Sequence, residues 1–202
     1  MKWDGQQTPT WNEPISNEAA KRAIAERVKS EGLSIRCVPT SLEIESYAAA
    51  LGLPITSLID ARPDWCFDGA DEVDPSGNMI KGRGGAFVRE QLVFAAAARR
   101  IILVDDSKFV PRLGTNFGVP IAVVPEAANL VRQRVREATG VEPQVRPAKG
   151  KDGGVIDEQG SLVMDLTTDG VIEPSALEAL LLTTPGISAT GLFIGYEFEV
   201  IK

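Results

Sequence analysis

Along the first 118 residues, the apolar positions alternate between the spacing of helices and the spacing of strands. Apolar residues recur every three or four positions, which predicts helices, in residues 18–32, 42–52 and 85–99. Short apolar runs between turn residues predict strands in residues 34–38, 54–58, 65–67 and 100–104. Strands that alternate with helices favour a parallel sheet covered by helices on both faces.

After Gly114 the order of the elements changes. Strands are predicted in residues 119–124, 143–146, 161–166 and 187–192, and helices in residues 126–139 and 173–183. This β-α-β-β-α-β order is typical of a small α+β unit. We therefore expect two domains, residues 1–118 together with 193–202 and residues 119–192. Residues 193–201 are predicted to form a last strand that returns to the larger sheet.

The composition is that of a soluble folded protein. Hydrophobic residues make up 44% of the 202 residues and charged residues 24%. Lys plus Arg number 21 against 28 Asp plus Glu, a net charge of −7, so the chain has no overall basic field that would draw it to nucleic acid. It contains no histidine, which excludes His-based triads and His-ligated zinc. Acid–base chemistry must fall to carboxylates, Lys, Tyr or Cys, and small molecules are favoured as partners.

The cysteines and the N-terminus both indicate a cytoplasmic protein. Cys37 and Cys66 each lie inside an apolar, strand-like run, which favours reduced thiols in the core over a disulfide or a nucleophile. No apolar run has the length of a membrane span, and residues 1–14 are too polar for a secretory signal. We expect an irregular segment over residues 1–14 and no membrane partner.

Candidate chemistry is densest in residues 67–90. Asp68 and Asp71 follow the carboxyl end of an apolar strand, where ligands bind in open α/β sheets. Two carboxylates on such a turn can also serve only as cap or turn acceptors. Residues 81–85, KGRGG, precede a predicted helix, so their backbone amides can approach an anion. This segment matches neither the G-x-G-x-x-G fingerprint nor the P-loop.

Two further charged residues allow both a functional and a structural interpretation. Glu90 lies in a predicted helix among apolar neighbours. Either it pairs with Arg89 on a solvated face, or it is a carboxylate suited to taking a proton from carbon. Lys108 follows the predicted strand 100–104, where it would suit a phosphate as a point charge or would be a surface lysine.

These residues stand in an order that resembles the type A ribose-5-phosphate isomerase family. The chain carries D-G-A-D-E at 68–72, K-G-x-G-G-A-x-x-R-E at 81–90 and D-x-S-K at 105–108. The resemblance extends over about residues 33–195 and includes P-G-I-x-x-x-G-L-F-I-G at 185–195.

The resemblance implies a cofactor-free and metal-free isomerisation between ribose 5-phosphate and ribulose 5-phosphate through a cis-enediolate. Glu90 matches the family's base, which moves a proton between C1 and C2, and Lys81 matches the group that stabilises the oxyanion. Asp68 matches the residue that helps to open the furanose ring, and Asp71 a partner of the substrate hydroxyls. The other positions expected to bind substrate are Gly69, Ala70, Gly82, Arg83, Gly84, Lys108, Thr40 and Ser41. The family is usually dimeric or tetrameric, which implies a homodimer or homotetramer.

The N-terminal region departs from the family pattern. The family holds the sugar's phosphate in a G-T-G-S-T loop, whereas residues 11–20 here read W-N-E-P-I-S-N-E-A-A. Glu13 would repel a phosphate if it pointed inward, whereas Thr40 and Ser41 would add hydroxyls. Arg83 stands where the family usually has Gly, either as a replacement phosphate ligand or as the partner of a nearby carboxylate.

Three functions fit these residues. The first is ribose 5-phosphate isomerisation, the second the same chemistry on another, possibly unphosphorylated, sugar, and the third a non-catalytic sugar-phosphate-binding module. The presence of a complete proton-transfer set favours an enzyme, because sensing needs no proton shuttle. The expected fold is α/β, a Rossmann-like, mostly parallel sheet with a small ferredoxin-like α+β subdomain, and the site lies at the strand ends between them.

Overall fold

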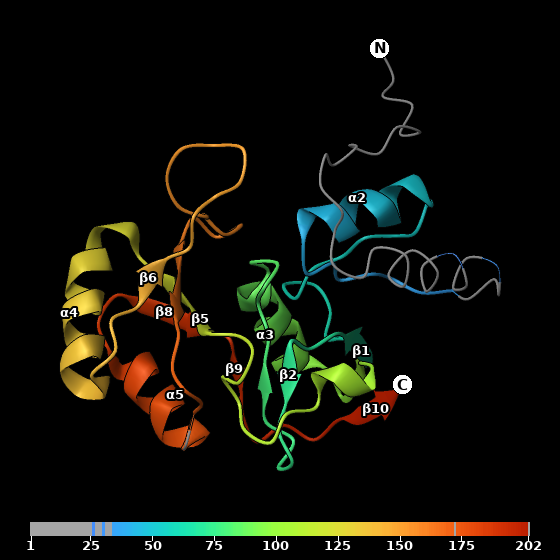
Figure 1. Ribbon diagram of the computed structural model, residues 1–202. Coiled ribbons are helices and arrows are strands. Elements are labelled where there is room, and N and C mark those ends of the chain that lie inside the picture. Colours follow the sequence, from blue (N-terminus) through green and yellow to red (C-terminus); the bar gives the residue numbers. More distant parts are fainter. Residues whose placement is uncertain (1–25, 27–29, 31–33, 172, 202) are drawn as a thin grey trace.

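The computed structural model describes residues 26, 30, 34–171 and 173–201 (Figure 1). Glu26 and Ser30 are both helical, but the rest of the helix predicted over residues 18–32 lies outside the described residues. The predicted irregular segment over residues 1–14 and the altered phosphate segment over residues 11–20 lie outside them as well.

A three-stranded parallel sheet forms the first layer. It consists of β1 (Trp65–Asp68), β4 (Arg99–Leu103) and β10 (Glu199–Ile201), in the order β1-β4-β10. Helix α3 (Phe87–Ala96) packs on it through Val93 and Phe94, which share a buried cluster with Ile102 of β4. Apolar burial between helix and sheet therefore fixes the carboxyl ends of the strands relative to α3.

The strands predicted at 34–38 and 54–58 were wrong. The structure has only one parallel bridge there, between Cys37 and Ile55, flanking α2 (Leu42–Ala50). Pro39 and Pro54 lie next to this bridge and have no N–H to donate, so a longer ladder does not form. The predicted helix between them is confirmed, and Ser41 caps it by accepting from the amide of Ile44 at 3.2 Å.

A second, antiparallel sheet of very short strands was not predicted. It contains β2 (Glu72–Val73), β3 (Met79–Ile80) and β9 (Leu192–Phe193), in the order β2-β3-β9. The single last strand predicted over 193–201 was therefore wrong, because its first residue belongs to β9 and only β10 joins the parallel sheet. Gly195, at a φ of 71°, breaks the run, and Tyr196 then packs edge-on against Phe94.

The second half of the chain forms the ferredoxin-like unit that the pattern predicted. Its strands are β5 (Val119–Val123), β6 (Gln144–Val145), β7 (Leu162–Leu166) and β8 (Ile187–Thr190). They are antiparallel in the order β6-β7-β5-β8, and α4 (Ala128–Thr139) and α5 (Pro174–Thr183) lie on the same side of this sheet (Figure 1). The short helices η1 (Asp106–Lys108) and η2 (Pro125–Ala127) follow β4 and β5. The division into two domains stays a prediction, since Ile80 and Leu192 of the small sheet share a buried cluster with Ile121 of β5.

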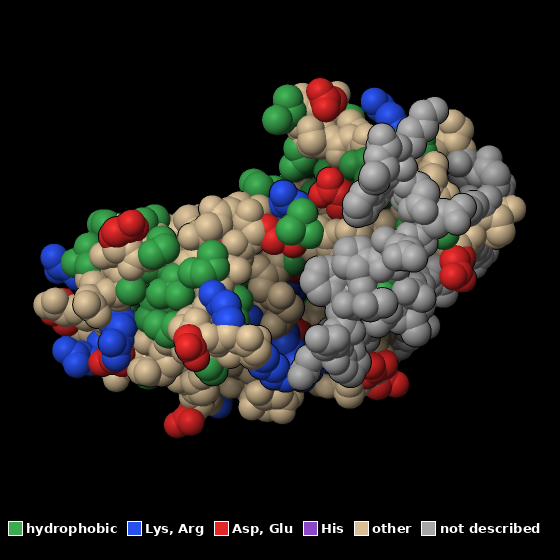
Figure 2. Space-filling model, turned by 90° about the horizontal axis from the view of Figure 1, so that it is seen from above, with side chains coloured by type: hydrophobic (Ala, Val, Ile, Leu, Met, Phe, Trp, Pro, Cys, Tyr) green, Lys and Arg blue, Asp and Glu red, His purple; other side chains and the backbone are tan. Residues whose placement is uncertain are grey.

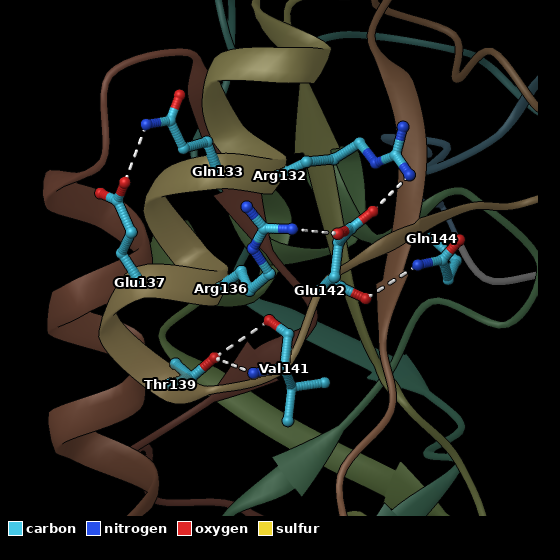
Figure 3. A network of polar contacts seen from close by, with 8 residues as sticks. All are labelled: Arg132, Gln133, Arg136, Glu137, Thr139, Val141, Glu142 and Gln144. Atoms are coloured by element: carbon cyan, nitrogen blue, oxygen red, sulfur yellow. Dashed lines mark hydrogen bonds and ion pairs between the residues drawn. The ribbon is translucent and has the colours of Figure 1, made fainter.

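A polar network joins the end of α4 to the start of β6 (Figure 3). Gly140, at a φ of 76°, ends the helix in the left-handed conformation. Arg132 and Arg136 of α4 then both bind Glu142, the latter at 3.2 Å. The two arginines share this one carboxylate, and these contacts fix the turn from α4 into β6.

Acidic and basic side chains are mixed over the face shown in Figure 2, in agreement with a chain that lacks a basic field. Among the described residues, none of the helices is both long enough and apolar enough to cross a membrane. Both cysteines are free thiols, as predicted, Cys66 buried and Cys37 half-buried. Burial raises the pKa of Cys66 to about 11, which disfavours the nucleophilic thiolate.

Candidate active site

A buried lysine lies at the centre of the candidate site. Lys81 is 3% exposed, and its Nζ lies 2.9 Å from Oδ2 of Asp68 and 3.2 Å from Oε2 of Glu90. The same Nζ donates to the carbonyl oxygen of Gly69 at 2.5 Å. Burial alone would lower the pKa of Lys81, but the negative charges of Asp68 and Glu90 outweigh it and raise the pKa above its usual range. The lysine is therefore a fixed cation between two carboxylates.

Three elements deliver these groups to one point. Asp68 ends β1, Lys81 directly follows β3, and Glu90 lies in the first turn of α3. The interpretation of Glu90 as a partner of Arg89 was wrong, because Arg89 pairs with Glu158 at 3.2 Å. Arg89 and Glu90 are neighbours in the sequence but bind different partners, Glu158 and Lys81.

A close backbone approach holds Lys81 in place. Its amide donates to the carbonyl oxygen of Gly191 at 2.9 Å. A Cβ on Gly191 would lie 2.3 Å from the carbonyl oxygen of Lys81 and 2.6 Å from Cδ of Pro120, so only glycine fits. Gly191 of the 185–195 motif is therefore required for close packing beside Lys81.

The glycine-rich loop after Lys81 is also tightly constrained. Gly82 has a φ of 108°, and a Cβ there would lie 2.7 Å from the ring of Phe87. The amide of Arg83 donates to Oδ2 of Asp71 at 3.0 Å. Asp71 thus anchors the loop from the side of β2, a contact that the sequence did not reveal.

The structure brings together the two cations that the sequence singled out as phosphate ligands. The guanidinium of Arg83 lies 5.5 Å and the Nζ of Lys108 5.9 Å from the centre of the same ring, that of Phe117. Cations over an aromatic face are attracted by its quadrupole, so the Phe117 ring stabilises both positive charges. Sequence reasoning missed Phe117, which no motif marks.

Phe117 is itself positioned by a buried carboxylate that sequence reasoning also missed. Glu72 is fully buried in β2 and accepts from the amides of Gly114 at 2.6 Å, Phe117 at 3.1 Å and Asn116. A buried carboxylate is stable only when hydrogen bonds replace its water, and here three amides do so. Glu72, the last residue of D-G-A-D-E, therefore has a structural role: it binds the backbone of the loop 114–117.

The first residues of α2 line the same cleft, and some of their polar groups are already hydrogen-bonded within the protein. The amide of Leu42 donates to Oε1 of Glu158 at 2.8 Å, and the Ser41 hydroxyl accepts from the amide of Ile44. Thr40 and Ser41 both line the cleft, and so does Glu158. A sugar phosphate that reached these hydroxyls would therefore lie near the negative charge of Glu158. Glu158 could not be identified from the sequence, because it lies 116 residues away from Leu42, whose amide it binds.

All predicted site residues line one cleft, whose volume of about 1560 Å³ easily holds a sugar phosphate. Lys81, the end of β1, residues of α2 and residues 155–158 all line this cleft. In the described part of the chain, no group of three or more Asp, Glu and Cys side chains is placed to hold a metal ion.

Comparisons with known proteins agree with this arrangement. The family model described as ribose 5-phosphate isomerase A (phosphoriboisomerase A) matches residues 36–202. The ribose-5-phosphate isomerase A of Natronomonas pharaonis is 42% identical over 183 residues, which cover 91% of this chain and 79% of that protein. The corresponding protein of Methanothermobacter thermautotrophicus is 40% identical over 178 residues, 88% of this chain and 78% of that protein.

Solved structures show the same likeness. Ribose 5-phosphate isomerase A from Methanocaldococcus jannaschii superposes with a TM-score of 0.82 at 31% identity, over 88% of this chain and 78% of that one. A D-ribose-5-phosphate isomerase in complex with phospho-erythronic acid superposes with a TM-score of 0.80 at 34% identity, over 86% of this chain and 76% of that one.

Proposed function

Because this chain belongs to the ribose 5-phosphate isomerase A family, we propose that it interconverts ribose 5-phosphate and ribulose 5-phosphate with Glu90 as the base. The observation that carries the proposal is the contact of the Lys81 ammonium with the carboxylates of both Asp68 and Glu90 at the end of the cleft. Isomerisation next to a carbonyl needs one group that accepts a proton and one group that stabilises a negative oxygen. In this proposal Glu90 accepts the proton and Lys81 stabilises the oxygen.

The proton transfer follows from the position of Glu90. Its carboxylate takes the proton from C2 of the open-chain aldose, and the electrons of the broken C–H bond form the C1–C2 double bond of the enediolate. The carbonyl oxygen on C1 becomes negative in the same step. Glu90 then returns its proton to C1, and the O2 proton leaves for O1, which gives the ketose. No atom is lost, and the base is restored.

Lys81 and the adjacent loop carry the electrostatic part of the reaction. The ammonium is already desolvated and held by Asp68 and Glu90, so it need not reorganise when charge develops on the substrate oxygens. Asp68, at the end of β1, is the group that passes a proton between the ring oxygen and O1 during ring opening. Gly84 lines the same cleft.

Turnover of a phosphorylated sugar tests the proposed function. We expect the purified chain to convert ribose 5-phosphate into ribulose 5-phosphate and to leave unphosphorylated ribose, allose and rhamnose unchanged, because Arg83 and Lys108 offer a dianion two positive charges. The ketose is measured by its absorbance or by NMR. Turnover of the free sugars alone would contradict this substrate, and binding of ribose 5-phosphate without turnover would indicate a sensing module.

A lysine substitution tests the phosphate site by itself. Lys108→Ala should raise the KM for ribose 5-phosphate about tenfold or more with little change in kcat, since a hydrogen bond to a charged group contributes about 1.5–3 kcal/mol. Steady-state kinetics give both constants. Lys151→Ala, at an exposed position in the loop between β6 and β7, is the matched control. A KM unchanged by Lys108→Ala, with chemistry rate-limiting, would remove Lys108 from the phosphate site.

The homodimeric or homotetrameric assembly and the cytoplasmic location stay predictions. Sedimentation of the purified chain measures the first, and fractionation of the cells that express it measures the second.

A further inference from the structure

Arg146 lies directly after β6 and outside the cleft, yet it reaches the loop of the candidate site. Its Nε donates to Oδ2 of Asp165 on β7 at 2.8 Å, and its Nη2 donates to Oδ1 of the same carboxylate. This two-point pairing fixes the plane of the guanidinium, because the fork of donors matches the carboxylate. The side chain is 17% exposed.

The remaining nitrogen of Arg146 binds two successive carbonyls of the glycine-rich loop. Its Nη1 donates to the carbonyl oxygen of Gly82 at 2.7 Å and to that of Arg83 at 3.1 Å. One arginine thus joins the edge of the antiparallel sheet to the loop that follows Lys81, across 63 to 64 residues of sequence.

Peptide geometry converts these two contacts into an orientation of amides. All peptide bonds in the described residues are trans, and in a trans peptide the C=O and the following N–H point in opposite directions. The carbonyl of Gly82 points to Arg146, and the N–H of the same peptide, on Arg83, points the other way and donates to Asp71. The same rule applies to the next peptide. The carbonyl of Arg83 points to Arg146, so the N–H of Gly84 points away from Arg146, and Gly84 lines the cleft.

We propose that Arg146 is a positioning residue that holds the Gly82–Gly84 peptides so that the Gly84 amide faces the oxyanion of the reaction. The proposal rests on the proposed function, which supplies that oxyanion. Arg146 itself belongs to none of the sequence motifs. The Gly82–Arg83 peptide is also held by Asp71, at the Arg83 amide, and by the Gly85 amide, at the Gly82 carbonyl. The loss of Arg146 therefore chiefly frees the Arg83–Gly84 peptide, which would then populate other orientations, because the backbone of glycine rotates at little steric cost.

The expected effect is on kcat. Removing one preorganised oxyanion donor typically lowers kcat by about 10²–10³-fold, and a donor that is only mispositioned loses part of that. Arg146→Ala should therefore lower kcat for ribose 5-phosphate by about 10²-fold, with a change in KM of less than about threefold.

Asp165→Asn is the matched control, because it weakens the same ion pair but leaves the two carbonyl contacts of Arg146 in place. Both variants should lose a similar amount of thermal stability, whereas Asp165→Asn should keep kcat within about threefold of the wild type. Arg134→Ala, at an arginine of α4 that is 62% exposed and pairs with Glu137, should change neither quantity.

The measurements are kcat, KM and melting temperature for each variant, with kinetics taken well below the lowest melting temperature. A normal kcat in Arg146→Ala, or an equal loss of kcat in Arg146→Ala and Asp165→Asn, overturns the positioning role. If Arg146→Ala does not fold, Arg146→Lys replaces it. The ammonium has three donors on one atom in place of the planar fork and cannot make all four contacts of Arg146, so kcat must still fall below that of Asp165→Asn. A folded wild type that does not isomerise ribose 5-phosphate contradicts the proposed function itself, a result distinct from any difference among the variants.

Discussion

Glu90→Gln will lower kcat for ribose 5-phosphate by about 10²–10⁴-fold, the usual cost of removing a general base. Glutamine keeps the size of the side chain and can still contact Lys81, which lies 3.2 Å from the present carboxylate. It has no lone pair basic enough to take the proton from C2, so binding should persist while chemistry stops. Steady-state kinetics, together with titration of ribose 5-phosphate into the inactive variant, measure both.

The control for Glu90→Gln is Glu137→Gln, an exposed glutamate of α4 that accepts from Gln133. It removes the same charge far from the cleft and should leave kcat unchanged. Retention of more than about a tenth of the wild-type kcat by Glu90→Gln would remove Glu90 as the essential base.

Lys81→Met should both stop the reaction and weaken the fold. The variant loses the cation that meets the developing oxyanion, which should lower kcat by about 10²–10³-fold. It also leaves Asp68 and Glu90, which are 20% and 15% exposed, without their shared cation, and breaking a fully buried ion pair on one side costs about 3–5 kcal/mol, so we expect a loss of up to this amount in the free energy of unfolding. Urea denaturation monitored by circular dichroism measures the loss.

The control for the stability part is Lys151→Met, at an exposed loop position, which should leave the free energy of unfolding unchanged. A free energy of unfolding of Lys81→Met equal to that of the wild type would contradict this part of the prediction.

The parts of the site that the sequence predicted are those encoded locally. Asp68 and Lys81 follow strands directly, and Glu90 lies three residues into a helix, so strand ends and helical spacing place them near one another. The ferredoxin-like order was predictable for the same reason, since each of its elements except β6 is long enough to show its own periodicity.

The parts that could not be predicted depend on contacts between distant residues or on very short elements. Glu72 binds amides 42 to 45 residues away, and Arg146 binds carbonyls 63 to 64 residues away. The strands β2, β3 and β9 have two residues each, too few for any alternation to be visible. At 34–38 and 54–58 short apolar runs were predicted to be strands, but with prolines beside them they form only the single bridge between Cys37 and Ile55.

The pairing of Lys81 with Gly191 has a consequence for the synthesis of the chain. Residues 68–90 leave the ribosome early, but the carbonyl that holds the Lys81 amide, and the β9 strand that flanks β3, are translated more than 100 residues later. Domains fold as units once their elements have been made, so the nascent chain carries the proposed catalytic side chains long before they can be held in place. Chains released before residue 191 has been added should therefore be inactive, although they contain Asp68, Lys81 and Glu90.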